Sequence, residues 1–137
     1  MGLILDSSVV IAAERRGDNV AQFLRQVSAK TGNQEAALSS VGFVELVHGI
    51  HRAQTLEARV RREAFINELL ADLIVYAFTR DVAMLAGKLD GEQQGRGITI
   101  PFGDLLIGAT ALYLGYSLVT GNLRHFQKIP GLLVLQL

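Results

Sequence analysis

The chain has 137 residues, of which 50% are hydrophobic and 19% charged, and its 13 basic residues balance its 13 acidic residues. This length predicts one domain over residues 1–137, and the apolar content excludes an intrinsically disordered chain. No run reaches the roughly 18–20 uninterrupted apolar residues that cross a bilayer, and the N-terminus lacks the basic region and cleavage pattern of a signal peptide. Cysteine is absent, which excludes disulfides and thiolate catalysis and fits the reducing cytoplasm in which we expect the protein.

The zero net charge also limits how the chain contacts nucleic acid. Proteins that bind nucleic acid without sequence preference are usually basic over a whole domain, so any RNA contact here must come from a local patch. Basic residues cluster at Arg52, Arg59, Arg61 and Arg62, and again at Arg124 and Lys128. Solvated helix faces are the more common explanation for such clusters.

The first half of the chain alternates short apolar runs with helical periodicity. Ser7 or Ser8 is expected to cap the first helix, because a side-chain oxygen there satisfies free backbone N–H groups. The expected elements, in chain order, are a strand at Leu3–Leu5, a helix at Val9–Arg15, a helix from Asp18 or Asn19 to about Ala29, a weak strand at Ala36–Leu38, a helix capped by Ser39 or Ser40 and a helix at Leu56–Leu70 with Val60, Phe65, Leu69 and Leu70 as its apolar stripe.

The second half continues the alternation. The run Leu73–Tyr76 is typical of a buried parallel strand. After it, the sequence predicts a helix capped by Thr79, a helix stop at Gly95–Gly97, a buried helix at Gly103–Leu114, a strand at Ser117–Thr120 and an edge strand at Leu132–Leu135. Such alternation predicts an α/β fold of three layers, α/β/α, with a mainly parallel sheet of four or five strands and right-handed crossovers.

Three carboxylates stand where these expected elements begin or end. Asp6 follows the first strand, Glu45 lies early in a helix, and Asp104 opens the apolar run that follows it. The polar cluster Thr120-Gly121-Asn122 closes another strand. Ligands of open α/β sheets bind outside the carboxyl ends of the strands, and carboxylates gathered there repel one another unless a cation lies between them. The pattern predicts a divalent-metal site, with phosphodiester hydrolysis as its chemistry.

Two other chemistries fit parts of this pattern. The sequence from Glu45 to His51 has Glu-x-x-His and His-x-x-His spacing, which suits a transition metal, but the chain holds no second pair to complete such a site. A phosphoacceptor domain also places Asp at strand ends, yet no Asp ends the run Leu73–Tyr76. Each acid taken singly is more often a helix cap than a ligand, so the metal-site hypothesis depends on the three acids together.

Four segments together form a recognisable set of motifs: Leu3–Ser8, Val44–Ile50, Asp104–Ala111 and Val119–Phe126. They resemble the motifs of the PIN-domain ribonucleases, in particular the VapC-type toxins of toxin–antitoxin pairs. They lie in the same order as in that family and span essentially the whole chain. The resemblance implies a metal-dependent endoribonuclease that hydrolyses RNA, acts as a toxin, is neutralised by a cognate antitoxin and forms a homodimer and a hetero-oligomer with that antitoxin.

The family pattern can be carried over residue by residue. Asp6, Glu45 and Asp104 match the acidic ligands of Mg²⁺ or Mn²⁺, while Ser8 and Thr120 match polar positions that support the site. Asn122 is retained in the last motif, with Arg124 beside it as a substrate-contacting candidate. His125 stands where many relatives carry a fourth acid, and because Mn²⁺ accepts imidazole better than Mg²⁺ does, we expect at least equal activity with Mn²⁺.

Two further expectations concern partners and the alternative function. Apolar faces of the first helices and of Leu56–Leu70 are expected to leave a groove for an amphipathic antitoxin helix. The alternative is a noncatalytic acidic α/β module, either phosphoacceptor-like or a degenerate PIN domain that binds RNA or protein, because His125 replaces an acid.

Overall fold

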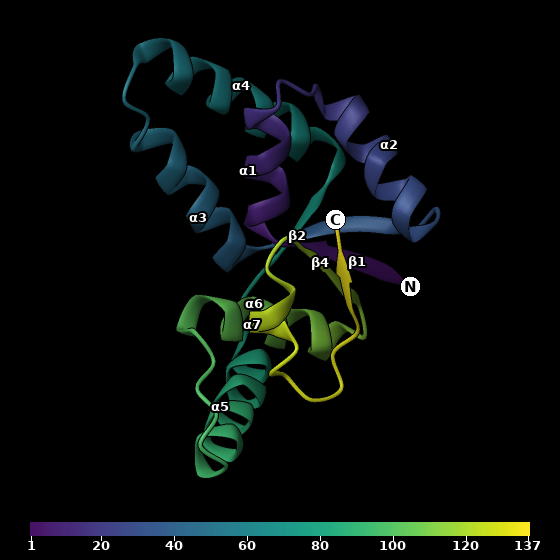
Figure 1. Cartoon of the computed structure of the whole chain (residues 1–137), viewed down its shortest axis with the longest axis vertical. Helices are drawn as coiled ribbons and strands as arrows, with labels where there is room; N and C mark the ends of the chain where they lie inside the picture. Colours follow the sequence, from purple (N-terminus) through teal and green to yellow (C-terminus); the bar gives the residue numbers. More distant parts are fainter.

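The computed structural model describes residues 1–137 as seven helices packed on a sheet of five parallel strands (Figure 1). The strand order is β3-β2-β1-β4-β5. The strands are β1 (Gly2–Leu5), β2 (Glu35–Ser39), β3 (Ile74–Tyr76), β4 (Ser117–Thr120) and β5 (Val134–Gln136). The helices are α1 (Ser7–Arg15), α2 (Val20–Thr31), α3 (Ser40–His51), α4 (Leu56–Asp72), α5 (Arg80–Gly95), α6 (Phe102–Leu114) and α7 (Leu123–Phe126).

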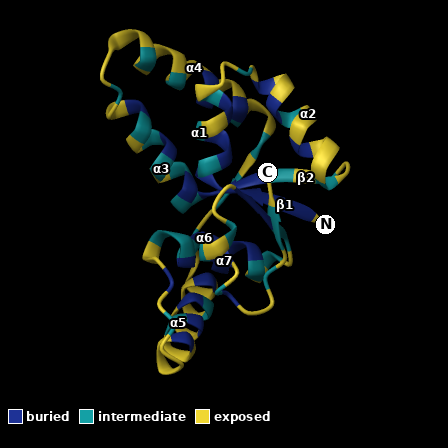
Figure 2. Cartoon of the chain, in the orientation of Figure 1, coloured by how far each residue is buried: buried dark blue, intermediate teal, exposed yellow.

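The sheet separates two hydrophobic cores, as the alternation of side chains along β1 shows. Leu3 and Leu5 pack into the core beneath α1, α2 and α4, whereas Ile4 packs into the core beneath α5 and α6. All three side chains are fully buried, and Figure 2 shows buried segments along the central strands and on the helix faces that meet them. The predicted three-layer α/β/α fold is therefore confirmed, with a sheet that is wholly rather than mainly parallel.

The strand order creates a crevice at the centre of the sheet. From β1 the chain moves through β2 to the edge strand β3, and it then crosses back to place β4 on the other side of β1. The connections that leave β1 and β4 consequently diverge to opposite sides. Such a reversal point is where open α/β sheets bind ligands, and Asp6 and Thr120 lie at it.

Side-chain caps begin several helices as predicted. Asn19 accepts a hydrogen bond from the backbone N–H of Gln22 and completes a capping box, and Ser39 and Thr79 cap α3 and α5 in the same way. The prediction for the first helix was wrong. The N-cap of α1 is Asp6, which makes no side-chain capping bond, because the hydroxyls of Ser7 and Ser8 instead donate to carboxylates.

Three further predictions need correction. The strand at Leu73–Tyr76 is an edge strand rather than a buried one, since β3 pairs only with β2 and Ile74 is 52% exposed. Val60 is 60% exposed, because the first turns of α4 extend beyond the helices beneath and only its second half is buried. The last strand occupies Val134–Gln136, so it begins two residues later and ends one residue later than expected.

Candidate active site

Asp6 is the most firmly held of the three acids. Its backbone N–H donates to the carbonyl of Val119 at 2.9 Å, which continues the pairing of β1 with β4. Its side chain is almost fully buried, and one oxygen, Oδ2, accepts hydrogen bonds from Ser8 at 2.7 Å and Thr120 at 2.8 Å. The other oxygen accepts no hydrogen bond from the protein and keeps contact with solvent. Asp6 thus has one oxygen fixed and one free.

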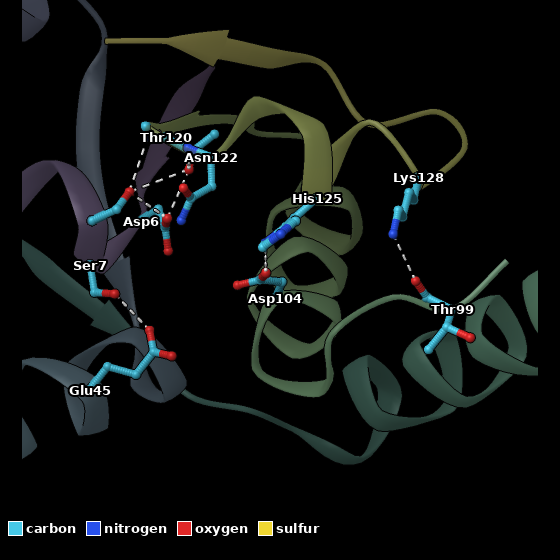
Figure 3. Close-up of polar contacts among 11 residues, drawn as sticks. Asp6, Ser7, Glu45, Thr99, Asp104, Thr120, Asn122, His125 and Lys128 are labelled. Atoms are coloured by element: carbon cyan, nitrogen blue, oxygen red, sulfur yellow. Dashed lines mark hydrogen bonds and ion pairs between the residues drawn. The ribbon is translucent and has the colours of Figure 1, made fainter.

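The loop after β4 completes this arrangement. The backbone N–H of Asn122 donates to the Thr120 hydroxyl at 2.9 Å, and the N–H of Gly121 donates to the Ser8 hydroxyl at 3.1 Å. Each hydroxyl that donates to Asp6 therefore accepts a backbone hydrogen bond, which fixes the direction of its own proton. This network joins the ends of β1 and β4, as Figure 3 shows.

Glu45 reaches the same region from the second turn of α3. Ser7 donates to its Oε1 at 2.7 Å. Its other oxygen lies against Gly103, where an added Cβ would come within 3.2 Å of Oε2. A side chain at position 103 would therefore crowd the carboxylate, and glycine there leaves room for Glu45 to approach α6.

Asp104 lies in the first turn of α6. Its Oδ2 is 2.8 Å from Nδ1 of His125, and 17% of its side chain is exposed. The start of a helix favours a negative charge because the first backbone N–H groups have no intrahelical partner. Figure 3 shows Asp6, Glu45 and Asp104 arranged around one common space, each from a different element.

Burial and mutual repulsion make two of these acids harder to ionise. The pKa of Glu45 is raised first by burial and then by the negative charges of Asp6 and Asp104, and the Ser7 hydrogen bond only partly opposes this. The pKa of Asp104 is likewise raised first by burial and also by the charge of Asp6, against the lowering effect of His125. The three acids therefore form one electrostatic group, and a cation among them would relieve their repulsion.

In their present conformations, no three acidic or histidine side chains lie close enough to ligate one ion directly. The reason is visible in the hydrogen bonds, since each carboxylate is turned toward a donor of its own: Asp6 toward Ser8 and Thr120, Glu45 toward Ser7, and Asp104 toward His125. The acids face one space but do not chelate a common point.

The remaining predicted residues divide into two groups. Ser8, Thr120 and His125 contact the acids directly, as described. The side chains of Asn122 and Arg124 are exposed and form no hydrogen bond or ion pair with the acids, although the backbone of Asn122 belongs to the network. They lie at the rim of the site.

Ser7 and Gly103 have roles that the sequence prediction missed. The adjacent serines are indistinguishable by residue type, and only the start of α1 at Ser7 decides that Ser7 faces Glu45 while Ser8 faces Asp6. His48 and His51, discounted as a transition-metal pair, do not come together with any third ligand. Nδ1 of His51 is instead 3.0 Å from an Arg59 guanidinium nitrogen.

Comparison with known proteins places this geometry in a family. The PIN domain profile matches residues 3–132. Ribonuclease VapC1 of Rickettsia felis is 33% identical over 98% of this chain and 96% of its own length, and Ribonuclease VapC of Rickettsia bellii is 31% identical over the same shares.

Solved structures agree on the fold. VapBC2 from Rickettsia felis, bound to a promoter DNA fragment, superposes with a TM-score of 0.86 at 23% identity, over 100% of this chain and 99% of that one. VapBC-1 from nontypeable Haemophilus influenzae gives 0.78 at 25% identity, over 98% and 96%. The resemblance inferred from the four segments is thereby confirmed. The chain belongs to the PIN-domain family, among the VapC ribonucleases.

Proposed function

We propose that this chain is a metal-dependent endoribonuclease that acts as the toxin of a toxin–antitoxin pair. The observation that supports this most strongly is the meeting of Asp6, Glu45 and Asp104 at the reversal point of a parallel sheet, where burial and mutual repulsion raise the pKa of Glu45 and of Asp104. The curated relatives named ribonucleases support the same reaction class.

The residues fit a hard divalent cation. All three candidate ligands are carboxylates, which suit Mg²⁺ and Mn²⁺, and Asp6 keeps one oxygen free of protein hydrogen bonds. Mg²⁺ retains several of its waters, so carboxylates that face one space without chelating one point can hold it partly through water. Asp6, Glu45 and Asp104 would bind the ion, and His125 would hold Asp104 through its contact with Oδ2.

A bound divalent cation supplies an activated water and neutralises the charge that develops on the phosphodiester. The protein's own contribution is orientation. Ser8 and Thr120 hold one oxygen of Asp6 so that the other points into the site, and Ser7 does the same for Glu45. Fixing ligands by such outer contacts typically changes metal affinity or activity by about 10–100-fold.

We propose an antitoxin as the protein partner, in a groove between α1, α3 and α4. Several solved relatives are toxin–antitoxin complexes, including VapBC from Salmonella typhimurium bound to DNA. The groove is lined by Val10, Ile11, Leu46 and Ile66, together with Glu14. The Glu14 carboxylate is already paired with Arg61 and Arg62, so a partner helix would be held in this groove mainly through its apolar face.

The test is cleavage of total cellular RNA by the purified chain with Mg²⁺, with Mn²⁺ or with EDTA, beside Asp6→Asn and Asp104→Asn. Asp81→Asn is a matched control, because Asp81 also lies in the first turn of a helix, α5, but outside the site. We expect discrete fragments that require metal, persist in Asp81→Asn and disappear in the other two variants.

Failure has a distinct meaning. A folded, metal-supplemented chain that binds RNA without cleaving it would favour the degenerate, binding-only domain, and His125 would be the first residue to replace. Cleavage that continues in EDTA or in both Asn variants would contradict the proposed site.

A further inference from the structure

The far end of the α1–α3 pair differs from the active-site end in its charge. Both helices begin at the carboxyl edge of the sheet and run away from it (Figure 1), and Ser7 joins their first turns by its bond to Glu45. α1 ends at Arg15, and Arg52 directly follows α3. Both arginines border one open concavity of about 480 Å³, whose other charged or ionisable members are His48 and Arg62.

No carboxylate lines this concavity. The nearby Glu14 lies within 4 Å of the guanidinium groups of Arg61 and Arg62 only. Arg62 is further engaged through a 2.8 Å hydrogen bond to the carbonyl of Gly49. Arg15 and Arg52 are exposed and make no ion pair or side-chain hydrogen bond with the protein. Two arginines therefore remain uncompensated at one spot on a chain whose net charge is zero.

The helical positions connect this concavity with the acids. Glu45, His48 and Arg52 follow one another at spacings of three and four residues and so share one face of α3. Gly49 lies on the same face, and nothing comes within 4 Å of a Cβ added there. Seven residues of helix correspond to about 10 Å. An extended polyanion leaving the acidic site along this face would meet His48 and then the two arginines.

We propose that Arg15 and Arg52, with His48, form a subsite for the phosphate backbone of the RNA strand next to the cleaved bond. Guanidinium groups suit phosphate because they donate from a planar fork and are always charged. The N-terminus of α4, whose cap Thr55 also lines the concavity, adds favourable backbone dipoles. The inference rests on the proposed function, since it extends the binding site of the same substrate.

RNA is favoured over an acidic protein segment because the concavity continues the open face that leads from Glu45. Arg15, Gly49 and Arg62 also line the apolar groove between α1, α3 and α4. A partner helix in that groove would therefore cover part of the RNA path as well as approach the acids.

The test is binding of a fluorescent single-stranded oligouridylate of about ten nucleotides, a common site size for such strands, to the Asp104→Asn chain. Adding Arg15→Ala and Arg52→Ala should weaken binding about tenfold at 0.1 M salt. Loss of two phosphate contacts should also lower the slope of log K against log salt by about 1.4, because each contact to a single strand contributes about 0.7.

Two further pairs serve as controls in the same background. Arg25→Ala with Arg80→Ala removes two exposed arginines on α2 and α5 and should leave both the affinity and the slope unchanged. Arg15→Lys with Arg52→Lys keeps the charge and should restore most of the slope, which a misfolded variant could not do.

The outcomes separate this inference from the proposed function. If the unsubstituted chain cleaves RNA and the Arg15→Ala, Arg52→Ala pair leaves affinity and slope unchanged, the subsite is refuted while the nuclease stands. If the chain does not cleave RNA but the Arg15→Ala, Arg52→Ala pair removes RNA binding, the phosphate-binding subsite is supported and the nuclease activity is not. An oligoglutamate peptide of equal charge that binds as tightly, and loses binding in the same pair, would overturn the assignment to RNA.

Discussion

The two ends of the α1–α3 pair carry opposite charges, and they differ in how firmly the charged side chains are held. At the sheet, carboxylates of like charge are gathered, and hydroxyl groups of Ser7, Ser8 and Thr120 hold two of them in place. At the far end, Arg15 and Arg52 line the same concavity, but no other group of the protein holds their side chains in place. A site that must orient a metal ion needs fixed ligands, whereas a contact to a flexible phosphate chain needs mainly charge.

A zero net charge therefore conceals a separation of charge within one pair of helices. The acids occupy the start of α1 and α6 and one face of α3, and the uncompensated arginines occupy the other end of α1 and α3. Composition alone predicts weak attraction to nucleic acid, and only the packing of α1, α3 and α4 gathers the basic residues.

The largest change in this comparison is expected from removing the hydroxyl donors of Asp6. In a Ser8→Ala, Thr120→Val double variant, both hydrogen bonds to Oδ2 are lost and the carboxylate can rotate. RNA cleavage should fall about 10–100-fold, the usual range for outer contacts of metal ligands. Steady-state cleavage assays at saturating Mn²⁺ measure this.

Thr120→Ser keeps the hydroxyl and should retain most of the activity. Thr31→Val is a control, because the Thr31 hydroxyl donates to a backbone carbonyl of α2 far from the acids. Full activity in the Ser8→Ala, Thr120→Val variant would mean that the rigidity of the acidic end does not matter.

A smaller effect concerns His125, which contacts Asp104 where many relatives carry an acid. His125→Asp would replace an imidazole with an oxygen ligand, which Mg²⁺ prefers. We expect the ratio of cleavage rates in Mn²⁺ and Mg²⁺ to fall severalfold. An unchanged metal preference and affinity would show that His125 has no influence on the ion.

The smallest expected effect is a gain in thermal stability when Glu45 is replaced by glutamine and no metal is present. Because the pKa of folded Glu45 is raised from 4.5, the folded state holds its proton to higher pH than the unfolded state does. At pH values above the pKa of folded Glu45, its unfavourable charge therefore lowers the free energy of unfolding. This loss of stability disappears as pH falls below the pKa of Glu45 in the unfolded chain. Glu45→Gln removes the charge and still accepts from Ser7, so at pH 7 in EDTA it should raise Tm by roughly 1–3 °C, since partly exposed charges contribute little.

Thermal unfolding followed by circular dichroism at pH 7 and at pH 4 measures this difference. The gain should disappear at pH 4, where Glu45 is protonated in the wild-type protein too. Glu57→Gln is the control, because Glu57 is an exposed acid in the first turn of α4 and its removal should not stabilise the chain. A Glu45→Gln variant less stable than wild type at pH 7 would contradict the electrostatic account.

The sequence predicted the parts of the site that depend on strand ends. Asp6 and Thr120 each follow an apolar run, and parallel pairing brings their ends together. Glu45 was also expected early in a helix, and it lies in the second turn of α3. These relations follow from local pattern and from the rule that strands of an α/β sheet share one direction.

What the sequence could not predict depends on packing between elements. Ser7 contacts Glu45 and Ser8 contacts Asp6 because α1 starts at Ser7, and no local pattern fixes that start. The edge position of β3 depends on strand order, which hydrophobicity does not encode. The concavity at Arg15 and Arg52 depends on where α1, α3 and α4 meet, so the chain's basic residues resembled ordinary solvated charges.

The most direct test of the central claim is a calorimetric titration of Mn²⁺ into the wild-type, Asp6→Asn and Asp81→Asn chains, with RNA cleavage measured on the same samples. We predict that wild type and Asp81→Asn bind Mn²⁺ and cleave RNA, and that Asp6→Asn loses both properties while remaining folded. Undiminished Mn²⁺ binding or cleavage in Asp6→Asn would contradict a metal-dependent nuclease built on these three acids.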